Sequence, residues 1–178
     1  MSDQTIADIY AANDRIREKF KGTLAGLTES QLSTLPDDEK WTISQIVEHV
    51  SMVENGIMRI CAKLLEKAKA EGQLSDGKVK FSDAFGARSA EIATMKLEAP
   101  EFVHPKNERS VVDSLASMDE TMNGLVELRP LFEEFDGDTH KFPHPFFGDL
   151  SAVEWLALCG GHKARHLKQI NNLAEKIG

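Results

Sequence analysis

Apolar residues recur at intervals of three and four along most of this 178-residue chain, which is the spacing of one face of an α-helix. Four such stretches are long, and they begin near Ile6, Ile43, Val111 and Ser151. No stretch alternates apolar and polar residues over a useful strand length. Amphipathic helices of this kind bury their apolar faces against one another, so the sequence predicts an all-α four-helix bundle.

Two of the helix starts carry a capping box, in which a side-chain hydroxyl and a residue three positions later satisfy free backbone N–H groups. Thr42 precedes Gln45 in this way, and Ser151 precedes Glu154. The second and fourth long helices are therefore predicted to begin directly after Thr42 and Ser151.

The helical pattern is lost over residues 72–108, between the second and third apolar stretches. A connection of this length is uncommon in a compact domain unless it crosses the bundle, and an amphipathic piece over 90–97 predicts a short helix inside it. Pro130 is expected to end or kink the third helix. Residues 136–149 are expected to form an irregular segment before the last helix.

Charge and composition exclude several classes of partner. The chain has 29 acidic against 21 basic residues, a net charge of -8, whereas nucleic-acid binding normally requires a basic face. No apolar run approaches the roughly 20 residues of a membrane span, and the N-terminal segment lacks the features of a secretory signal. Cys61 and Cys159 alone make no disulfide framework. We therefore expect a cytoplasmic protein with no nucleic-acid or membrane partner.

Three histidines occupy the core-facing stripes of two predicted helices. His162 and His166 lie four residues apart on the last helix, so they share one face, and His49 lies on the apolar stripe of the second helix. Burying such rings without partners costs about 1–3 kcal/mol each. A shared divalent cation is one explanation, because neutral imidazole is a good ligand and three protein ligands leave a position open. Three separately hydrogen-bonded core histidines are the other, and the residues alone leave both open.

Further residues lie one turn from these histidines. Gln45, Gln169 and Cys159 are candidates for orienting a ligand ring or the substrate, although Cys159 also fits an inert core position. Gly160 and Gly161 precede His162 inside a predicted helix, where each glycine costs about 1 kcal/mol relative to alanine. They either open room for a substrate or allow close packing of a neighbouring helix.

Three segments together resemble the DinB/YfiT-like family: residues 41–50 (WTISQIVEHV), residues 144–148 (HPFFG) and residues 162–170 (HKARHLKQI). The resemblance implies one DinB-like domain over residues 1–178, an up-down-down-up bundle with 72–108 as the crossover between the second and third helices. The metal ligands that it implies are His49, His162 and His166.

The resemblance also implies a class of function. The family includes thiol-dependent S-transferases and isomerases, and proteins proposed as metal-dependent hydrolases. We therefore expect a divalent-metal-dependent enzyme that activates a thiol or water, with Zn or Ni as the favoured ions. S-transfer from a low-molecular-weight thiol is the reaction that we expect first. A metal-dependent hydrolase and a non-catalytic, metal-stabilised interaction module are the alternatives, so catalysis itself stays open. Homodimers occur in the family and are compatible with this chain.

Overall fold

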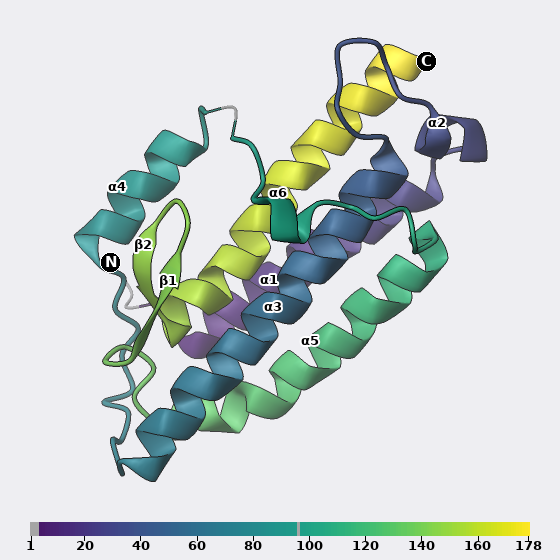
Figure 1. The fold of residues 1–178 in the computed structure, drawn as a ribbon. Coiled ribbons are helices and arrows are strands. Elements are labelled where there is room, and N and C mark those ends of the chain that lie inside the picture. The colour runs from purple at the N-terminus through teal and green to yellow at the C-terminus, as the bar shows by residue number, and fades with distance from the viewer. Residues whose placement is uncertain (1–3, 96) are drawn as a thin grey trace.

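The computed structural model describes residues 4–95 and 97–178, which form a bundle of long helices, with one short helix and a two-stranded hairpin on one side of it (Figure 1). The helices are α1 (Ile6–Ala25), α2 (Glu29–Ser33), α3 (Ile43–Ala70), α4 (Asp83–Ile92), η1 (Glu101–Val103), α5 (Val111–Glu134) and α6 (Ala152–Ile177). The strands are β1 (Lys141–His144) and β2 (Gly148–Ser151), which pair antiparallel.

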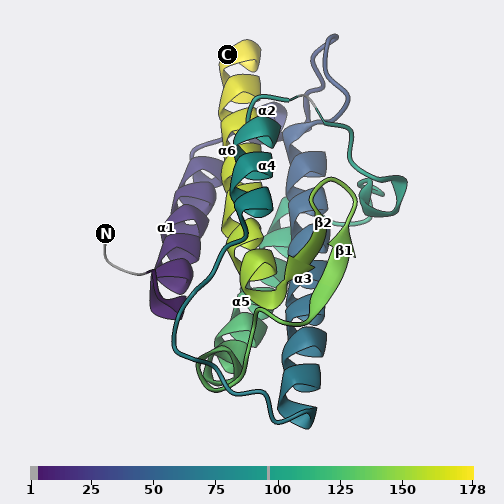
Figure 2. The same ribbon diagram turned by 90° about the vertical axis from the view of Figure 1, so that its left-hand side faces the viewer.

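The four long helices confirm the predicted four-helix bundle. Helix α3 packs against α5 and α6, and α1 packs against α6. In Figures 1 and 2, α1 and α6 run towards the end of the bundle that carries the C-terminus, while α3 and α5 run the other way. The long connection between α3 and α5 contains α4 and η1, and it lies along the face formed by α3 and α6.

Both predicted helix starts are confirmed. The hydroxyl of Thr42 accepts a hydrogen bond from the backbone N–H of Gln45, whose side chain accepts one from the backbone N–H of Thr42. Ser151 and Glu154 make the same reciprocal pair at the start of α6. These contacts fix the first turns of the two helices that carry the histidines.

Two local predictions are wrong, and a third is wrong in one of its two alternatives. Residues 136–149 are not wholly irregular, because the β1–β2 hairpin begins within them. The short helix of the crossover is α4, which begins at Asp83 rather than Ala90 because Ser82 caps its first turn. Of the two outcomes expected at Pro130, an end or a kink of the third helix, the first does not occur, because α5 continues to Glu134. The carbonyl that loses its partner there belongs to Val126, whose side chain is exposed, so water can replace the missing N–H.

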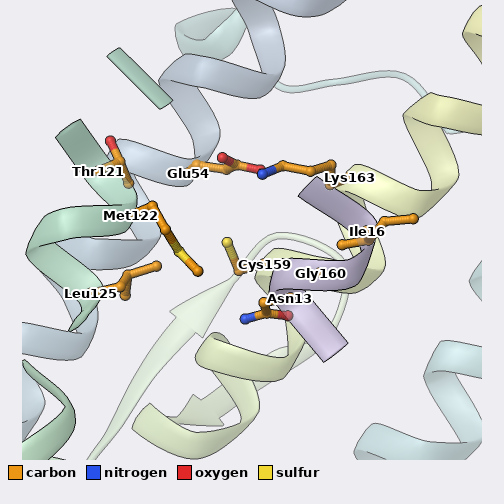
Figure 3. A pocket seen from close by; sticks show the side chains of 9 residues that line it. All are labelled: Asn13, Ile16, Glu54, Thr121, Met122, Leu125, Cys159, Gly160 and Lys163. Carbon is orange, nitrogen blue, oxygen red and sulfur yellow. The ribbon is translucent and has the colours of Figure 1, made fainter. Parts of the chain in front are cut away.

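The bundle core consists of two apolar clusters with a polar layer between them. One cluster includes Ile57 and Leu156, and the other includes Val50 and Ile170. Each long helix contributes one buried polar residue at the level between them: Asn13, Glu54, Thr121 and Lys163. These four side chains border a cavity of about 10 Å³, which is room for about one water (Figure 3).

An ion pair joins α3 to α6 within this polar layer. The ammonium of Lys163 lies 3.0 Å from a carboxylate oxygen of Glu54, and both side chains are at least 94 % removed from solvent. Figure 3 shows the two groups pointing at each other across the bundle. That oxygen of Glu54 has no well-aligned hydrogen-bond donor among the described residues, so the contact is chiefly electrostatic. Burial raises the pKa of Glu54 to about 7, although Lys163 acts in the opposite direction.

None of the helices in residues 4–95 and 97–178 combines the length with the apolar character that crossing a membrane requires.

Candidate metal centre

The structure brings His49 of α3 together with His162 and His166 of α6. The Nε2 atom of His162 lies 3.3 Å from Nε2 of His49 and 3.2 Å from Nε2 of His166. One nitrogen from each of the three rings falls within 4.8 Å of the other two. Nitrogens bound tetrahedrally at about 2.05 Å to one zinc ion would lie about 3.3 Å apart, so this spacing fits a shared cation.

Hydrogen bonds fix which nitrogen of two rings carries the proton. The Nδ1–H of His49 donates to the carbonyl oxygen of Val103 over 2.8 Å, because a carbonyl can only accept. The Nδ1 of His166 lies 3.0 Å from Oε1 of Gln169, to which it donates. In each neutral ring the Nε2 atom then carries a lone pair, and both lone pairs point towards His162. Such support of the far ring nitrogen is typical of histidines that bind metals.

The ring of His162 cannot donate a hydrogen bond to the Nε2 lone pairs of both His49 and His166. With its proton on Nε2 it can donate to His49 or to His166, which leaves the other lone pair without a donor. Its Nδ1 atom is buried and has no hydrogen-bond partner among the described residues. With the proton on that Nδ1, three lone pairs converge on one point, an arrangement that a cation relieves.

All three rings are kept neutral by their surroundings. Burial lowers the pKa of His49, although the bond to Val103 acts against the shift. Burial also lowers the pKa of His166 to about 3, and it lowers that of His162 well below the ordinary value, helped by charge on the other two rings. Neutral imidazole is the form that binds a metal, so these rings need release no proton to do so.

The long crossover covers the site and supplies the Val103 carbonyl. The two carboxylate oxygens of Glu48 accept hydrogen bonds from the backbone N–H groups of Asn107 and Glu108. Asn107 has a φ angle of 59°, a left-handed conformation that asparagine tolerates better than most residues. These contacts fasten the crossover to α3 beside His49, since Glu48 is its neighbour in sequence.

Of the three residues that the sequence suggested for orienting a ligand ring or the substrate, the structure places one in contact with a histidine of the cluster. Gln169 does contact His166. Gln45 instead donates to the side chain of Asn107, because its carbonyl oxygen is used in the helix cap. Cys159 faces the buried cavity beside Lys163 rather than the histidines. The carbonyl of Val103 was not anticipated, since every residue type carries this group and nothing in the sequence marks it.

Gly160 and Gly161 play different parts. A Cβ atom at Gly160 would lie 2.2 Å from Oδ1 of Asn13 in α1, so this glycine permits close helix packing. A Cβ atom at Gly161 would meet nothing within 4 Å, which leaves open space next to His162. Close packing of a neighbouring helix is therefore confirmed for Gly160, whereas room for a substrate stays a prediction at Gly161.

The two glycines provide a matched pair of substitutions. Gly160→Ala should lower the free energy of unfolding by about 1–2 kcal/mol, because overpacking against buried Asn13 outweighs the gain in helix propensity. Gly161→Ala should raise it by up to about 1 kcal/mol, because the new methyl group enters open space. Urea denaturation of both variants measures the difference, and equal effects would contradict the assignment.

Comparison with known proteins places the chain in a family. The sequence model of the DinB superfamily matches residues 12–170. An uncharacterized protein of Bacillus subtilis (strain 168), YuaE, is 25% identical over 155 residues, which cover 86% of this chain and 90% of that protein. The crystal structure of TT2238, a four-helix bundle protein, is similar with a TM-score of 0.61 and 22% identity, covering 93% of this chain and 98% of that one. The chain is therefore a member of the DinB superfamily.

Proposed function

We propose that this protein is a divalent-metal-dependent enzyme in which His49, His162 and His166 hold the cation. The observation that carries the proposal is the convergence of three buried Nε2 atoms, two of them with lone pairs fixed by hydrogen bonds at Nδ1. Zinc and nickel suit three imidazoles about equally well. Such a cation, when bound, lowers the pKa of a thiol or water in its remaining position.

S-transfer from a low-molecular-weight thiol is the reaction that these surroundings favour. Water needs a general base more than a thiol does, since a thiol has a pKa near 8.5 before any activation. The two carboxylates next to the site elements are already engaged. Glu48 accepts from the crossover backbone, and Glu154 accepts from the backbone of Ser151 and from Ser82. Neither is available as a base, which supports a thiol over water as the nucleophile.

The residues of the chain have separate tasks in this proposal. The Val103 carbonyl and Gln169 hold two imidazoles in the tautomer and orientation that direct Nε2 inwards. The apolar surroundings keep all three rings unprotonated near neutral pH. The open space at Gly161 is where an electrophile can approach without displacing a side chain.

Metal analysis of protein purified without a histidine tag tests the proposal. The wild type should carry about one zinc or nickel ion per chain after reconstitution and dialysis, and His162→Ala should lose it, with affinity reduced more than about 100-fold, beyond the loss typical of an outer partner. His140→Ala is the matched control, because His140 contacts Glu71 away from the cluster and its replacement should leave the metal content unchanged.

Catalysis requires a second measurement. The metal-loaded protein should join a low-molecular-weight thiol to a small electrophile, and His162→Ala should abolish the reaction. Metal-dependent ester hydrolysis without thiol transfer would favour a hydrolase. A metal that raises the melting temperature but supports neither reaction would favour an interaction module, and absence of bound metal in the wild type would refute all three metal-based functions.

A further inference from the structure

The β1–β2 hairpin brings a fourth histidine towards the candidate metal centre. His144 ends β1, and in both Figure 1 and Figure 2 the tip of the hairpin reaches the level of η1, which carries Val103. The ring of His144 lies 5.1 Å, between centroids, from that of Trp155, which precedes His162 by seven residues on the same face of α6, or about 10 Å along the helix axis. None of the functions assigned above uses His144.

One hydrogen bond decides what the ring of His144 offers. The backbone N–H of Phe146 donates to Nδ1 of His144 over 3.1 Å. Since Nδ1 accepts, it has no proton, and the neutral ring carries its only proton on Nε2. Burial lowers the pKa of His144 to about 4, which agrees with a neutral ring.

The Nε2–H of His144 is a free donor. No described residue accepts from it, and Nε2 is not among the fully buried atoms that lack partners, so it is open to solvent. Aromatic side chains surround the ring: Phe147 and Trp155 lie 5.0 and 5.1 Å away between ring centroids. Arg88 donates to the carbonyl oxygen of Phe146 and holds the hairpin tip in place.

The charge near the histidine cluster favours an anionic partner. Arg165 lies between the two histidines of α6 in sequence, and its charge acts on both rings. Its guanidinium donates to the carbonyl oxygens of Ile92 and Met95, and no carboxylate among the described residues pairs with it. A bound divalent cation would add to this positive field, although the whole chain carries a net charge of -8.

We propose that His144 is a specificity-determining residue that donates a hydrogen bond from Nε2 to a carboxylate of the thiol compound bound at the three-histidine site. The compound is accordingly a small thiol with a carboxylate a few bonds from sulfur, its apolar part lying against the partly exposed Phe147. This inference rests on the proposed function and adds to it the chemical class of the thiol substrate.

Two substitutions separate the free donor from the turn that His144 supports. His144→Asn keeps an acceptor for the N–H of Phe146, as asparagine does in ordinary turns, but removes the donor at the Nε2 position. His144→Gln places an amide donor near the Nε2 position and gives up the turn acceptor. A merely structural role predicts that the glutamine variant is the damaged one, whereas a role in recognition predicts that the asparagine variant is.

Thiol binding to cobalt-substituted protein provides a test that does not depend on activity. Thiolate ligation of cobalt gives a near-ultraviolet charge-transfer band, which is titrated with 3-mercaptopropionate and with propanethiol. The wild type should bind the carboxylate-bearing thiol at least about tenfold more tightly, as one hydrogen bond to a charged group provides. His144→Asn should lose this preference with cobalt content unchanged, and His144→Gln should retain part of it.

Equal affinity of the wild type for the two thiols, or a full preference retained in His144→Asn, would overturn the role of His144 while leaving the thiol function standing. If neither thiol produces the charge-transfer band, the proposed thiol function and this inference are overturned together. Mercaptoacetate and 4-mercaptobutyrate extend the series, and the chain length with the strongest preference measures the reach from sulfur to the Nε2–H donor.

Discussion

Lys163→Met should lower the free energy of unfolding by about 3–5 kcal/mol at pH 8, the cost of leaving a buried charge without its partner. The carboxylate of Glu54 lies 3.0 Å from the Lys163 ammonium in the interior of the bundle, where the roughly one water that the adjoining cavity can hold does not supply the lost positive charge. Urea denaturation monitored by circular dichroism measures the change. At pH 6 the loss should be smaller, because Glu54, whose pKa is raised to about 7, is then largely protonated.

The double variant Glu54→Leu/Lys163→Met is the control for this result. Replacing both members of a buried pair with apolar residues is often neutral or stabilising, so much of the lost stability should return. If the single substitution costs less than about 1 kcal/mol, or the double variant is no better than the single one, the ion pair is not the interaction that this layer depends on. The second outcome would point to the cavity and its neighbours Asn13 and Thr121.

The ion pair also has a geometric consequence for the histidines. Lys163 follows His162 directly, so the two side chains leave α6 about 100° apart and contact different parts of the bundle. Its partner Glu54 lies on α3, which also carries His49. A buried attraction between opposite charges at this level of the core resists rotation of α6 relative to α3, and that rotation would separate the three Nε2 atoms.

Much of the site could be predicted from the sequence because its determinants are local. The spacing of His162 and His166 puts both rings on one helix face whatever the surrounding fold, and the capping boxes fix where α3 and α6 begin. Antiparallel packing of two helices with known starts then brings His49 to the level of His162 and His166 along the bundle axis. The remaining geometry depends on backbone groups of the crossover, such as the Val103 carbonyl, which leave no mark in the sequence.

The β1–β2 hairpin and the buried ion pair were missed for different reasons. Pro143 lies inside β1, and proline normally argues against a strand, although an edge strand in a two-stranded sheet tolerates it. The sequence alone led to no prediction for Glu54 or Lys163. A signal was available, since Glu54 lies four residues after Val50 and three before Ile57, on the apolar stripe of α3. Charged residues on apolar stripes of two adjacent helices indicate a buried pair.

The metal-free protein should become less stable as the pH falls from 7.5 to 5.5. Burial lowers the pKa of His49, His162 and His166 in the folded state, while the unfolded chain takes up protons near pH 6.5. Between those pKa values the unfolded state binds more protons than the folded state, so the free energy of unfolding decreases as the pH is lowered. Each such histidine contributes up to about 1.4 kcal/mol per pH unit. Glu54 acts in the opposite direction, because its raised pKa makes the folded state the better proton acceptor below about pH 7.

Substitution isolates the contribution of a single ring from these opposing terms. His166 is the best choice, since its folded-state pKa is lowered to about 3 and it therefore stays neutral across the whole range. In His166→Gln the slope of unfolding free energy against pH below 6.5 should decrease by about 1 kcal/mol per pH unit, because that proton uptake by the unfolded chain is gone. Urea denaturation of both metal-free proteins at pH 7.5, 6.5 and 5.5 gives the two slopes. Identical slopes would mean that His166 takes up its proton as readily in the folded chain as in the unfolded one, and then acid would release a metal by direct protonation of the ligands rather than by weakening the fold around them.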